Sequence, residues 1–427
     1  MYANVKSKSE VLALPASTIE ELSSPEARGR EDMASSKVPL TVLLPLLSFL
    51  LYSQSANLWK LAGRAYIDRT RLVRWQNSTA LNSDNCKVYH EANACEDVKI
   101  HFASSTAFLA CGDPLERTHW YPCAGVRTVE RRSETSFREF LFKHDLKTGK
   151  TSELDIRGLE GDFITHGIDI FPVAEDSSKI HIFAVNHARD GDSIAIFLHE
   201  LGSNVVELVK NVKHANIKTA NGVAAVGSLE FYITNDHYFA GGMMRDLEEM
   251  FGPWGWATHV QYCDASTEDV LCRQVTDTFP GANGLNLWKD RLFVGDSKNG
   301  TVTIFEIDKD KSVTQLQMVD LGAAADNINI LPTTGDLLVS VFPTLEDLPK
   351  YLANVKSLGK DLLVPAAALR LRQAKGYAPE LAYFNDGSVI SFQTAAAGDP
   401  YLDLYISTGV LQFGGFAVCK VPPGTFA

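Results

Sequence analysis

The sequence predicts an all-β fold, a six-bladed β-propeller over residues 85–427, and two observations support this prediction. First, this part of the chain consists of short runs rich in β-branched and aromatic residues, such as 179–185 and 230–234, several of which alternate with period two. Turn signals such as Lys298-Asn299-Gly300 separate the runs. Second, a loose unit recurs, in which a polar pair opens an apolar strand that is followed by a turn and a second strand.

The recurring unit places its polar residues where they can meet. Its copies start near residues 166, 221, 283 and 326, between 43 and 62 residues apart. Strand-rich repeats of this size are typical of propeller blades, and the strand-rich body has room for about six of them. The inner strand of each blade begins beside the central axis, so we expect the opening residues to line one tunnel. These openings are His166-Gly167, Asn221-Gly222, Asn283-Gly284 and Asp326-Asn327.

Few helices are expected. A short helix is predicted at 245–250 and another at 349–358, where Pro349 suits the first turn. Residues 57–80 have the apolar spacing of an amphipathic stem. The net charge of −12, the pI of about 5.4 and the absence of a Lys/Arg-rich run exclude a nucleic-acid surface.

The segment before the propeller divides into three parts. Residues 1–37 are polar without a clear period and are predicted to form a disordered tail. Residues 38–56 hold a leucine-rich run shorter than the ~20 apolar residues that span a bilayer. This run is either a type II signal anchor or, if translation starts at Met33, a signal peptide. Residues 57–84 are then a linker or stem.

Either interpretation of the leader sends the propeller into the secretory pathway, as a secreted or membrane-anchored protein. Membrane or lipid association through the N-terminal apolar segment is therefore expected. The glycosylation sequons at Asn77 and Asn299 agree with this route.

Seven cysteines fit an oxidising compartment. Cys263 and Cys272 flank a polar turn and could bridge a hairpin, whereas a bond between Cys86 and Cys419 would fasten a closed ring. Sequence does not fix the connectivity, and several free thiols are the alternative. Of the remaining three cysteines, Cys111 and Cys123 flank a proline-containing loop. Cys95 would then be the unpaired one.

The propeller sequence resembles the serum paraoxonase/arylesterase family from about Cys86 to Cys419. The likeness is strongest in the strings HGIDIF, AVNH, AVGSLEFYITNDHYF, ANGLNL and ADNINI, of which TNDHYF is the most specific. Members of that family are six-bladed propellers that hydrolyse lactones and aryl esters with Ca²⁺. The resemblance therefore implies a calcium-dependent hydrolase whose partner is a small lactone or ester.

The resemblance also implies a catalytic calcium site and a proton relay. Carboxylate and amide oxygens suit Ca²⁺, which would polarise the ester carbonyl and stabilise the developing oxyanion. His166 would activate water and His187 would relay the proton, since imidazole titrates near neutral pH. The alternative base or nucleophile is Asp326. The implied calcium ligands are Glu96, Asn221, Asn283, Asp326 and Asn327.

A second, structural calcium is implied by the resemblance at Asp97 and the backbone of Ile168. The third matching position is Gly222, where the family would have aspartate, so this chain lacks a donor there unless Asp169 compensates.

Three further residues complete the implied site. His237 and Asp236 would orient the loop below it or contact substrate. Phe342 stands where the family often has a histidine, and this phenylalanine would make the pocket more apolar.

Two other functions are compatible with the sequence. One is a non-catalytic, calcium-stabilised binding module, which the missing donor at Gly222 favours. The other is a strictosidine-synthase-like propeller enzyme. The retained pair His166 and His187 favours the hydrolase.

Overall fold

The computed structural model describes residues 44–45, 48, 69–252, 254, 256–357 and 361–427. The chain divides into two units, Met1–Ala56 and Asn57–Ala427. The tail expected at 1–37 and nearly all of the leader expected at 38–56 lie outside the described residues. Within the described part, no helix has the length and apolar character needed to cross a membrane.

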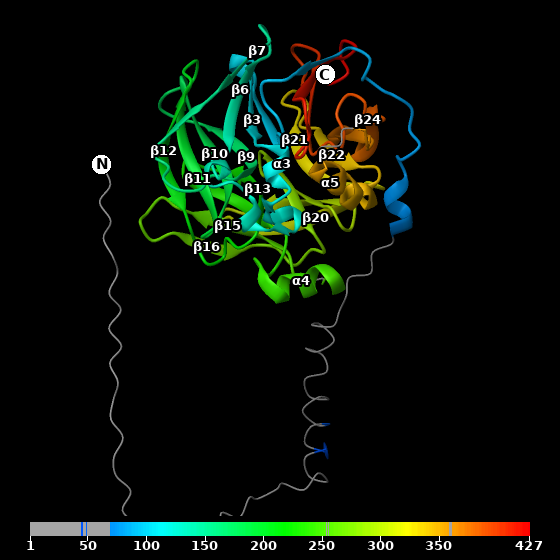
Figure 1. Ribbon diagram of the computed structural model, residues 1–427. Coiled ribbons are helices and arrows are strands. Elements are labelled where there is room, and N and C mark those ends of the chain that lie inside the picture. Colours follow the sequence, from blue (N-terminus) through cyan, green and yellow to red (C-terminus); the bar gives the residue numbers. More distant parts are fainter. Residues whose placement is uncertain (1–43, 46–47, 49–68, 253, 255, 358–360) are drawn as a thin grey trace, which may run out of the picture. The chain divides into compact units, whose positions relative to one another are not determined.

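The second unit is the predicted six-bladed propeller, as far as its described residues show (Figure 1). From the inner strand outward, the first blade consists of β2 (Asp97–His101), β3 (Thr106–Cys111), β6 (Phe140–Asp145) and β7 (Lys150–Glu153). The second blade consists of β9 (Thr165–Pro172), β10 (Lys179–Ala188), β11 (Gly191–Glu200), β12 (Val205–Val212) and β8 (Asp155–Arg157). The third consists of β13 (Ala220–Ala225), β14 (Glu230–Asn235), β15 (His259–Asp264) and β16 (Leu271–Gln274), and the fourth of β17 (Ala282–Trp288), β18 (Arg291–Asp296), β19 (Thr301–Ile307) and β20 (Val313–Asp320).

The last two blades complete the ring. They are β21 (Ala324–Ile330), β22 (Leu337–Phe342), β23 (Ala366–Arg372) and β24 (Ala378–Asn385), followed by β25 (Ala395–Asp399), β26 (Leu404–Thr408), β27 (Phe416–Lys420) and β1 (Cys86–Tyr89). The strand β1 pairs with β27, so the sixth blade joins the two ends of the propeller sequence. Each inner strand contacts the inner strands of the two neighbouring blades, which closes the ring around an axis.

The apolar core lies between blades rather than at the axis. Six clusters of buried residues fill the six interfaces between neighbouring blades. A further cluster, with Tyr121, Tyr351 and Phe392 among its members, covers one end of the ring. Because the apolar side chains pack between the sheets, the axis itself is left to polar residues.

Short helices lie outside the sheets. The structure has the two predicted helices, α4 (Gly242–Phe251) and α5 (Leu348–Lys356), with bounds shifted by a few residues. The remaining short elements are α3 (Pro114–Arg117), β4 (Trp120–Tyr121), β5 (Val126–Arg127), η1 (Arg69–Val73), η2 (Phe102–Ser104), η3 (Pro122–Ala124), η4 (Val129–Arg131), η5 (Glu134–Ser136), η6 (Leu345–Asp347) and η7 (Gln373–Lys375).

The described part of the expected stem packs on the propeller. Trp75 donates its indole N–H to the carbonyl of Leu321 at 2.8 Å, and Leu81 pairs with Phe384 of β24. The stem therefore runs along the fourth and fifth blades from residue 69 onward.

The disulfides confirm two expected pairs and correct the third. Cys86–Cys419 joins β1 to β27, and Cys263–Cys272 crosses the β15–β16 hairpin. Cys95, expected to be the unpaired cysteine, is bonded to Cys111, and the free thiol is Cys123. The register of β2 and β3 explains this pairing. Asp97 lies opposite Ala110, so Cys95 and Cys111, which lie just beyond this pair, come close together.

Candidate active site and metal centre

Each polar opening of the recurring unit lies at a bulge of an inner strand. In β13, Ala220 and Val223 are three residues apart, whereas their partners on β14, Asn235 and Ile233, are two apart, so β13 holds one extra residue. The inner strands β9, β17 and β21 hold the same extra residue. A bulge of this kind re-aims a side chain next to a functional site. The pattern therefore turns His166, Asn221, Asn283 and Asp326 out of the ladder at corresponding places around the axis.

A glycine follows three of these four polar residues, all except Asp326, and it allows close packing. A Cβ on Gly284 would lie 2.6 Å from the Cα of Asn327, and one on Gly167 would lie 2.5 Å from the carbonyl oxygen of Asn221. Neighbouring inner strands thus approach each other at these glycines. The His-Gly and Asn-Gly pairs of the sequence combine a functional side chain with the space that the ring needs.

One cavity of about 230 Å³ collects most of the predicted site residues, and we call it the hub cavity. Its wall also includes Tyr121, Cys123 and Lys298, together with an apolar side. The predicted residues that line it are Glu96, His166, Asn221, Asp236, His237, Asn283, Asp326 and Phe342.

The oxygen atoms of this cavity fit a calcium ion. Glu96 Oε2, Asn221 Oδ1 and Asn283 Oδ1 are buried without a hydrogen-bond donor. Burial raises the pKa of Asp326 well above its usual value, and the nearby carboxylates of Glu96 and Asp97 add to the effect. Unpaired buried acceptors and clustered carboxylates are costly without a cation, and hard oxygen donors are the ligands that Ca²⁺ prefers.

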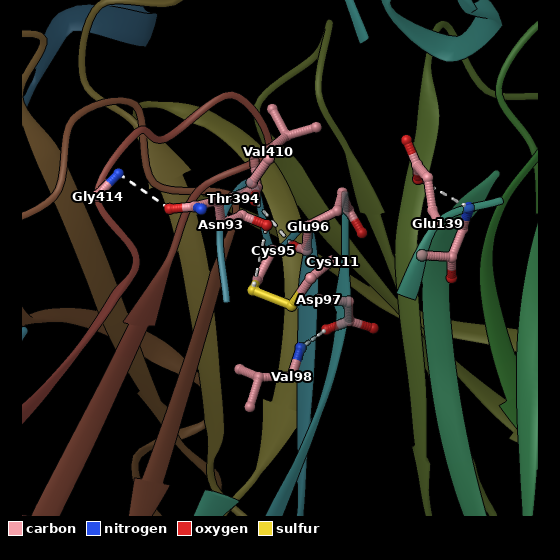
Figure 2. Close-up of a disulfide and its surroundings, with 12 residues drawn as sticks. Asn93, Cys95, Glu96, Asp97, Val98, Cys111, Glu139, Thr394, Val410 and Gly414 are labelled. Carbon is pink, nitrogen blue, oxygen red and sulfur yellow. Dashed lines mark hydrogen bonds between the residues drawn. A yellow bond between two sulfur atoms is a disulfide. The ribbon is translucent and has the colours of Figure 1, made fainter. Parts of the chain in front are cut away.

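Asn327 has a different place from the other predicted ligands. It does not line the hub cavity; its amide Nδ2 donates to Glu96 Oε1 at 2.7 Å and to the Glu96 carbonyl at 3.2 Å. Thr394 donates to the same carbonyl at 2.8 Å. These bonds hold Glu96 in position. The disulfide to Cys111 fixes Cys95, the residue before Glu96, and the side chains of Glu96 and Asp97 point away from the disulfide (Figure 2).

The two histidines contact each other, and each also contacts a carboxylate. His166 Nδ1 lies 2.9 Å from His187 Nε2, and His187 Nδ1 lies 3.0 Å from Asp192 Oδ1. His166 Nε2 lies 3.3 Å from Glu96 Oε1. Burial alone would lower the pKa of His187, but the Asp192 carboxylate outweighs it and raises that pKa. Burial would likewise raise the pKa of Glu96, but His166 and Asn327 outweigh it and hold the pKa below its usual value.

The Asn-Asp-His segment is held rigidly at the cavity wall. Asp236 Oδ1 lies 2.8 Å from His237 Nδ1, and Asp236 Oδ2 accepts from Asn221 Nδ2 at 3.5 Å. Burial would raise the pKa of Asp236, but His237 outweighs it and lowers that pKa. Glu248 of α4 accepts the backbone N–H groups of Tyr238 and Phe239. Through the contact of Asp236 with the Asn221 amide, the segment holds that side chain in its orientation at the cavity.

The donors around Asp97 do not fit a second calcium. Asp97 already accepts the N–H groups of Val98 and Ile168, and Lys99 Nζ lies 3.3 Å from Asp97 Oδ2. Lys99 also donates to the carbonyl of Ile328 at 3.3 Å. Burial raises the pKa of Asp97 to about 6, although Lys99 offsets part of the effect.

Gly222 has no side chain to supply the missing donor, and the surrounding residues leave no room for one. A Cβ there would lie 2.7 Å from Leu285 Cδ2 and 3.0 Å from the Leu285 amide nitrogen. The expected compensation by Asp169 is not needed either, since this half-buried residue has its carboxylate in the field of Lys99 as well. An ammonium group therefore supplies positive charge in this part of the tunnel.

Sequence reasoning missed several residues of the site. Asp192 orients His187, and Arg117 makes a buried ion pair with Glu139 at 2.7 Å while it donates to the carbonyls of Ala94 and Thr165. Arg117 thereby ties the segments before Glu96 and His166 together. These partners are far apart in sequence, and no short motif marks them.

Comparison with known proteins places the chain in a family. The family model described as Arylesterase matches residues 123–408. Serum paraoxonase/arylesterase 2 of Canis lupus familiaris is 30% identical over 77% of this chain and 88% of that protein. The Rattus norvegicus protein of the same name is 31% identical over 59% of this chain and 69% of its own length. Serum paraoxonase/lactonase 3 of Oryctolagus cuniculus is 28% identical over 60% and 70%. The sequence resemblance is thus confirmed, and the chain belongs to the serum paraoxonase/arylesterase family.

Proposed function

We propose that this chain hydrolyses lactones and aryl esters in the hub cavity, with one calcium ion held by Glu96, Asn221, Asn283 and Asp326. Membership of the family makes it an esterase or lactonase-type enzyme. The observation that carries the proposal is the set of unpaired buried oxygens in the same cavity as His166, whose Nδ1 lies 2.9 Å from His187 Nε2 behind the wall. Calcium bound there would polarise the substrate carbonyl and stabilise the oxyanion.

The histidine contacts define which nitrogen acts as the base. Asp192 keeps the proton on His187 Nδ1, so His187 Nε2 accepts the Nδ1–H of His166. His166 Nε2 is then free to take a proton from the attacking water. The imidazolium that results lies 3.3 Å from the Glu96 carboxylate, which stabilises its charge. The relay therefore favours His166 over Asp326 as the base.

The apolar wall of the cavity suits the organic part of an ester. Phe342 and Phe392 line this wall, and their phenyl rings stack with centroids 4.4 Å apart. Aryl groups or aliphatic lactone rings would bury apolar surface against this wall. Its other apolar members are Leu345, Leu348, Val410 and Leu411.

Removal of divalent ions is expected to abolish hydrolysis of phenyl acetate and of an aliphatic δ-lactone. Activity should return when calcium is added back after EDTA, because the ligand oxygens then regain their counter-charge. The measurement is initial rate on both substrates, with the melting temperature followed in the same samples. Full turnover in EDTA by protein shown to be metal-free would overturn the proposal, and a folded, calcium-loaded protein inactive on both substrates would favour a binding module.

Replacement of His166 with asparagine is expected to lower kcat by about 10² to 10⁴ while calcium binding is retained. His187→Asn should have a smaller effect, because His187 only relays the proton. His199→Asn is the matched control, since this buried histidine bonds the carbonyl of Val205 and lies outside the hub cavity. Unchanged turnover of His166→Asn would assign the base to Asp326 instead.

We further propose that the enzyme acts in the secretory pathway. Three disulfides among the described residues fit an oxidising compartment. The sequon residue Asn77 is exposed, whereas Asn299 is half-buried and accepts a hydrogen bond from Arg71. Glycan at Asn77, detected by peptide mass spectrometry of protein from secreting cells, is the expected mark.

A further inference from the structure

The free thiol of the described residues lies beside the histidine pair. Cys123 belongs to η3, directly after β4, and its Sγ, one ring nitrogen of His166 and one of His187 lie within 4.8 Å of one another. Cys123 lines the hub cavity and also a neighbouring cavity of about 640 Å³. His187 and Asp192 line that second cavity too, so an ion has a way to reach the three side chains.

Each histidine is held by a carboxylate on its outer nitrogen. Glu96 lies 3.3 Å from His166 Nε2, and Asp192 lies 3.0 Å from His187 Nδ1. When both outer nitrogens carry protons, two inner lone pairs face each other across 2.9 Å. Histidines that bind metal ions show this arrangement, in which a carboxylate on one nitrogen orients the other toward the ion.

We propose that Cys123, His166 and His187 form a binding site for a transition-metal ion of the zinc type, separate from the calcium position, and that the bound ion blocks hydrolysis. One thiolate and two imidazoles suit Zn²⁺ and leave a fourth position open for water. Calcium, which takes oxygen ligands, has little affinity for such a set. The two ions are therefore sorted by donor type although their sites adjoin.

The blocking part of the inference rests on the proposed function. On binding, the S–Zn bond forms and the thiol proton leaves to solvent. With the ion on His166 Nδ1, the single proton of the neutral ring moves from Nδ1 to Nε2, beside Glu96. His166 then has no lone pair to accept a proton from water. Zinc inhibits by fixing the tautomer that cannot act as the base.

Cobalt replacement tests the site without reference to activity. Calcium-loaded protein titrated with Co²⁺ is expected to develop a near-ultraviolet thiolate-to-cobalt absorption and tetrahedral visible bands, both removed by one equivalent of Zn²⁺. Cys123→Ala should lack the thiolate absorption. His119→Gln, a half-buried histidine on the same loop segment but outside the cluster, should keep it. A folded wild-type protein without the thiolate absorption would overturn the proposed site.

A second readout tests the blocking effect. Each variant is assayed on phenyl acetate against its own zinc-free rate, so that a change in basal turnover does not enter. The zinc concentration for half-inhibition should rise by at least ~10-fold in Cys123→Ala and stay unchanged in His119→Gln. Equal zinc sensitivity of all three proteins would refute inhibition through this site. A protein that shows the cobalt spectrum but hydrolyses neither ester would leave the metal site intact and reject only the proposed function.

Discussion

Replacement of Asp326 with asparagine is expected to stabilise the calcium-free protein and to remove its calcium-dependent hydrolysis. Burial raises the pKa of this carboxylate, and the nearby carboxylates of Glu96 and Asp97 add to the effect. Asparagine keeps the shape and removes one of the clustered charges, so the apo fold loses repulsion. The same change weakens calcium binding, because affinity depends on ligand charge. We expect kcat/KM to fall by about 100-fold or more.

Melting temperature with and without calcium is the measurement for Asp326→Asn. Wild-type protein should gain about 2.7 kcal/mol when free calcium reaches 100 times its Kd, and the variant should gain far less at the same concentration. Asp336→Asn is the matched control, because Asp336 is equally buried but paired with Arg370 at 2.6 Å. That control should lose stability and keep its calcium response. A variant at 326 that melts lower without calcium and still responds fully to it would contradict the site.

Replacement of Lys99 with methionine is expected to destabilise the propeller by about 3–5 kcal/mol. The lysine side chain is 6% exposed, and its ammonium group contacts Asp97 and offsets the charge of Asp169. Methionine fills similar space but leaves the buried carboxylate of Asp97 and the half-buried Asp169 without a cation. Urea unfolding at constant calcium measures the loss.

Lys210→Met is the control for Lys99→Met. Lys210 Nζ donates to the backbone carbonyl of Ala265 at 2.8 Å from the outer part of a blade, so its loss should cost little. Calorimetric titration of the wild type should give one calcium equivalent, since Lys99 and Gly222 leave no second set of donors. Two tight equivalents in the wild type, or an undiminished stability of Lys99→Met, would show that the ammonium group does not replace an ion.

The sequence predicts the ring well because its signals are local. A polar residue followed by glycine at the start of an inner strand is visible in one short string, and Gly167 and Gly284 explain why both members recur. Since the strings repeat at blade spacing, the meeting of His166, Asn221 and Asn283 at one cavity follows from symmetry alone. The helices predicted at 245–250 and 349–358, which the structure has at 242–251 and 348–356, rest on local signals as well.

The remaining features depend on contacts between distant segments. Lys99 meets the carbonyl of Ile328 across 229 positions, and nothing in the sequence around either residue indicates the contact. The pairing of Cys95 follows from strand register, which a list of cysteine spacings does not contain. The same holds for Cys123, whose neighbours are set by how η3 folds over the ring.

The closure of the ring by β1 and β27 has a consequence for biogenesis. The sixth sheet needs strands separated by more than 300 positions, joined by a disulfide that spans 333. During synthesis on the ribosome, β1 emerges long before its partner and stays unpaired until β27 has been made. The ring around the hub cavity therefore closes only when β27 pairs with β1, and the Cys86–Cys419 disulfide then fixes that pairing covalently.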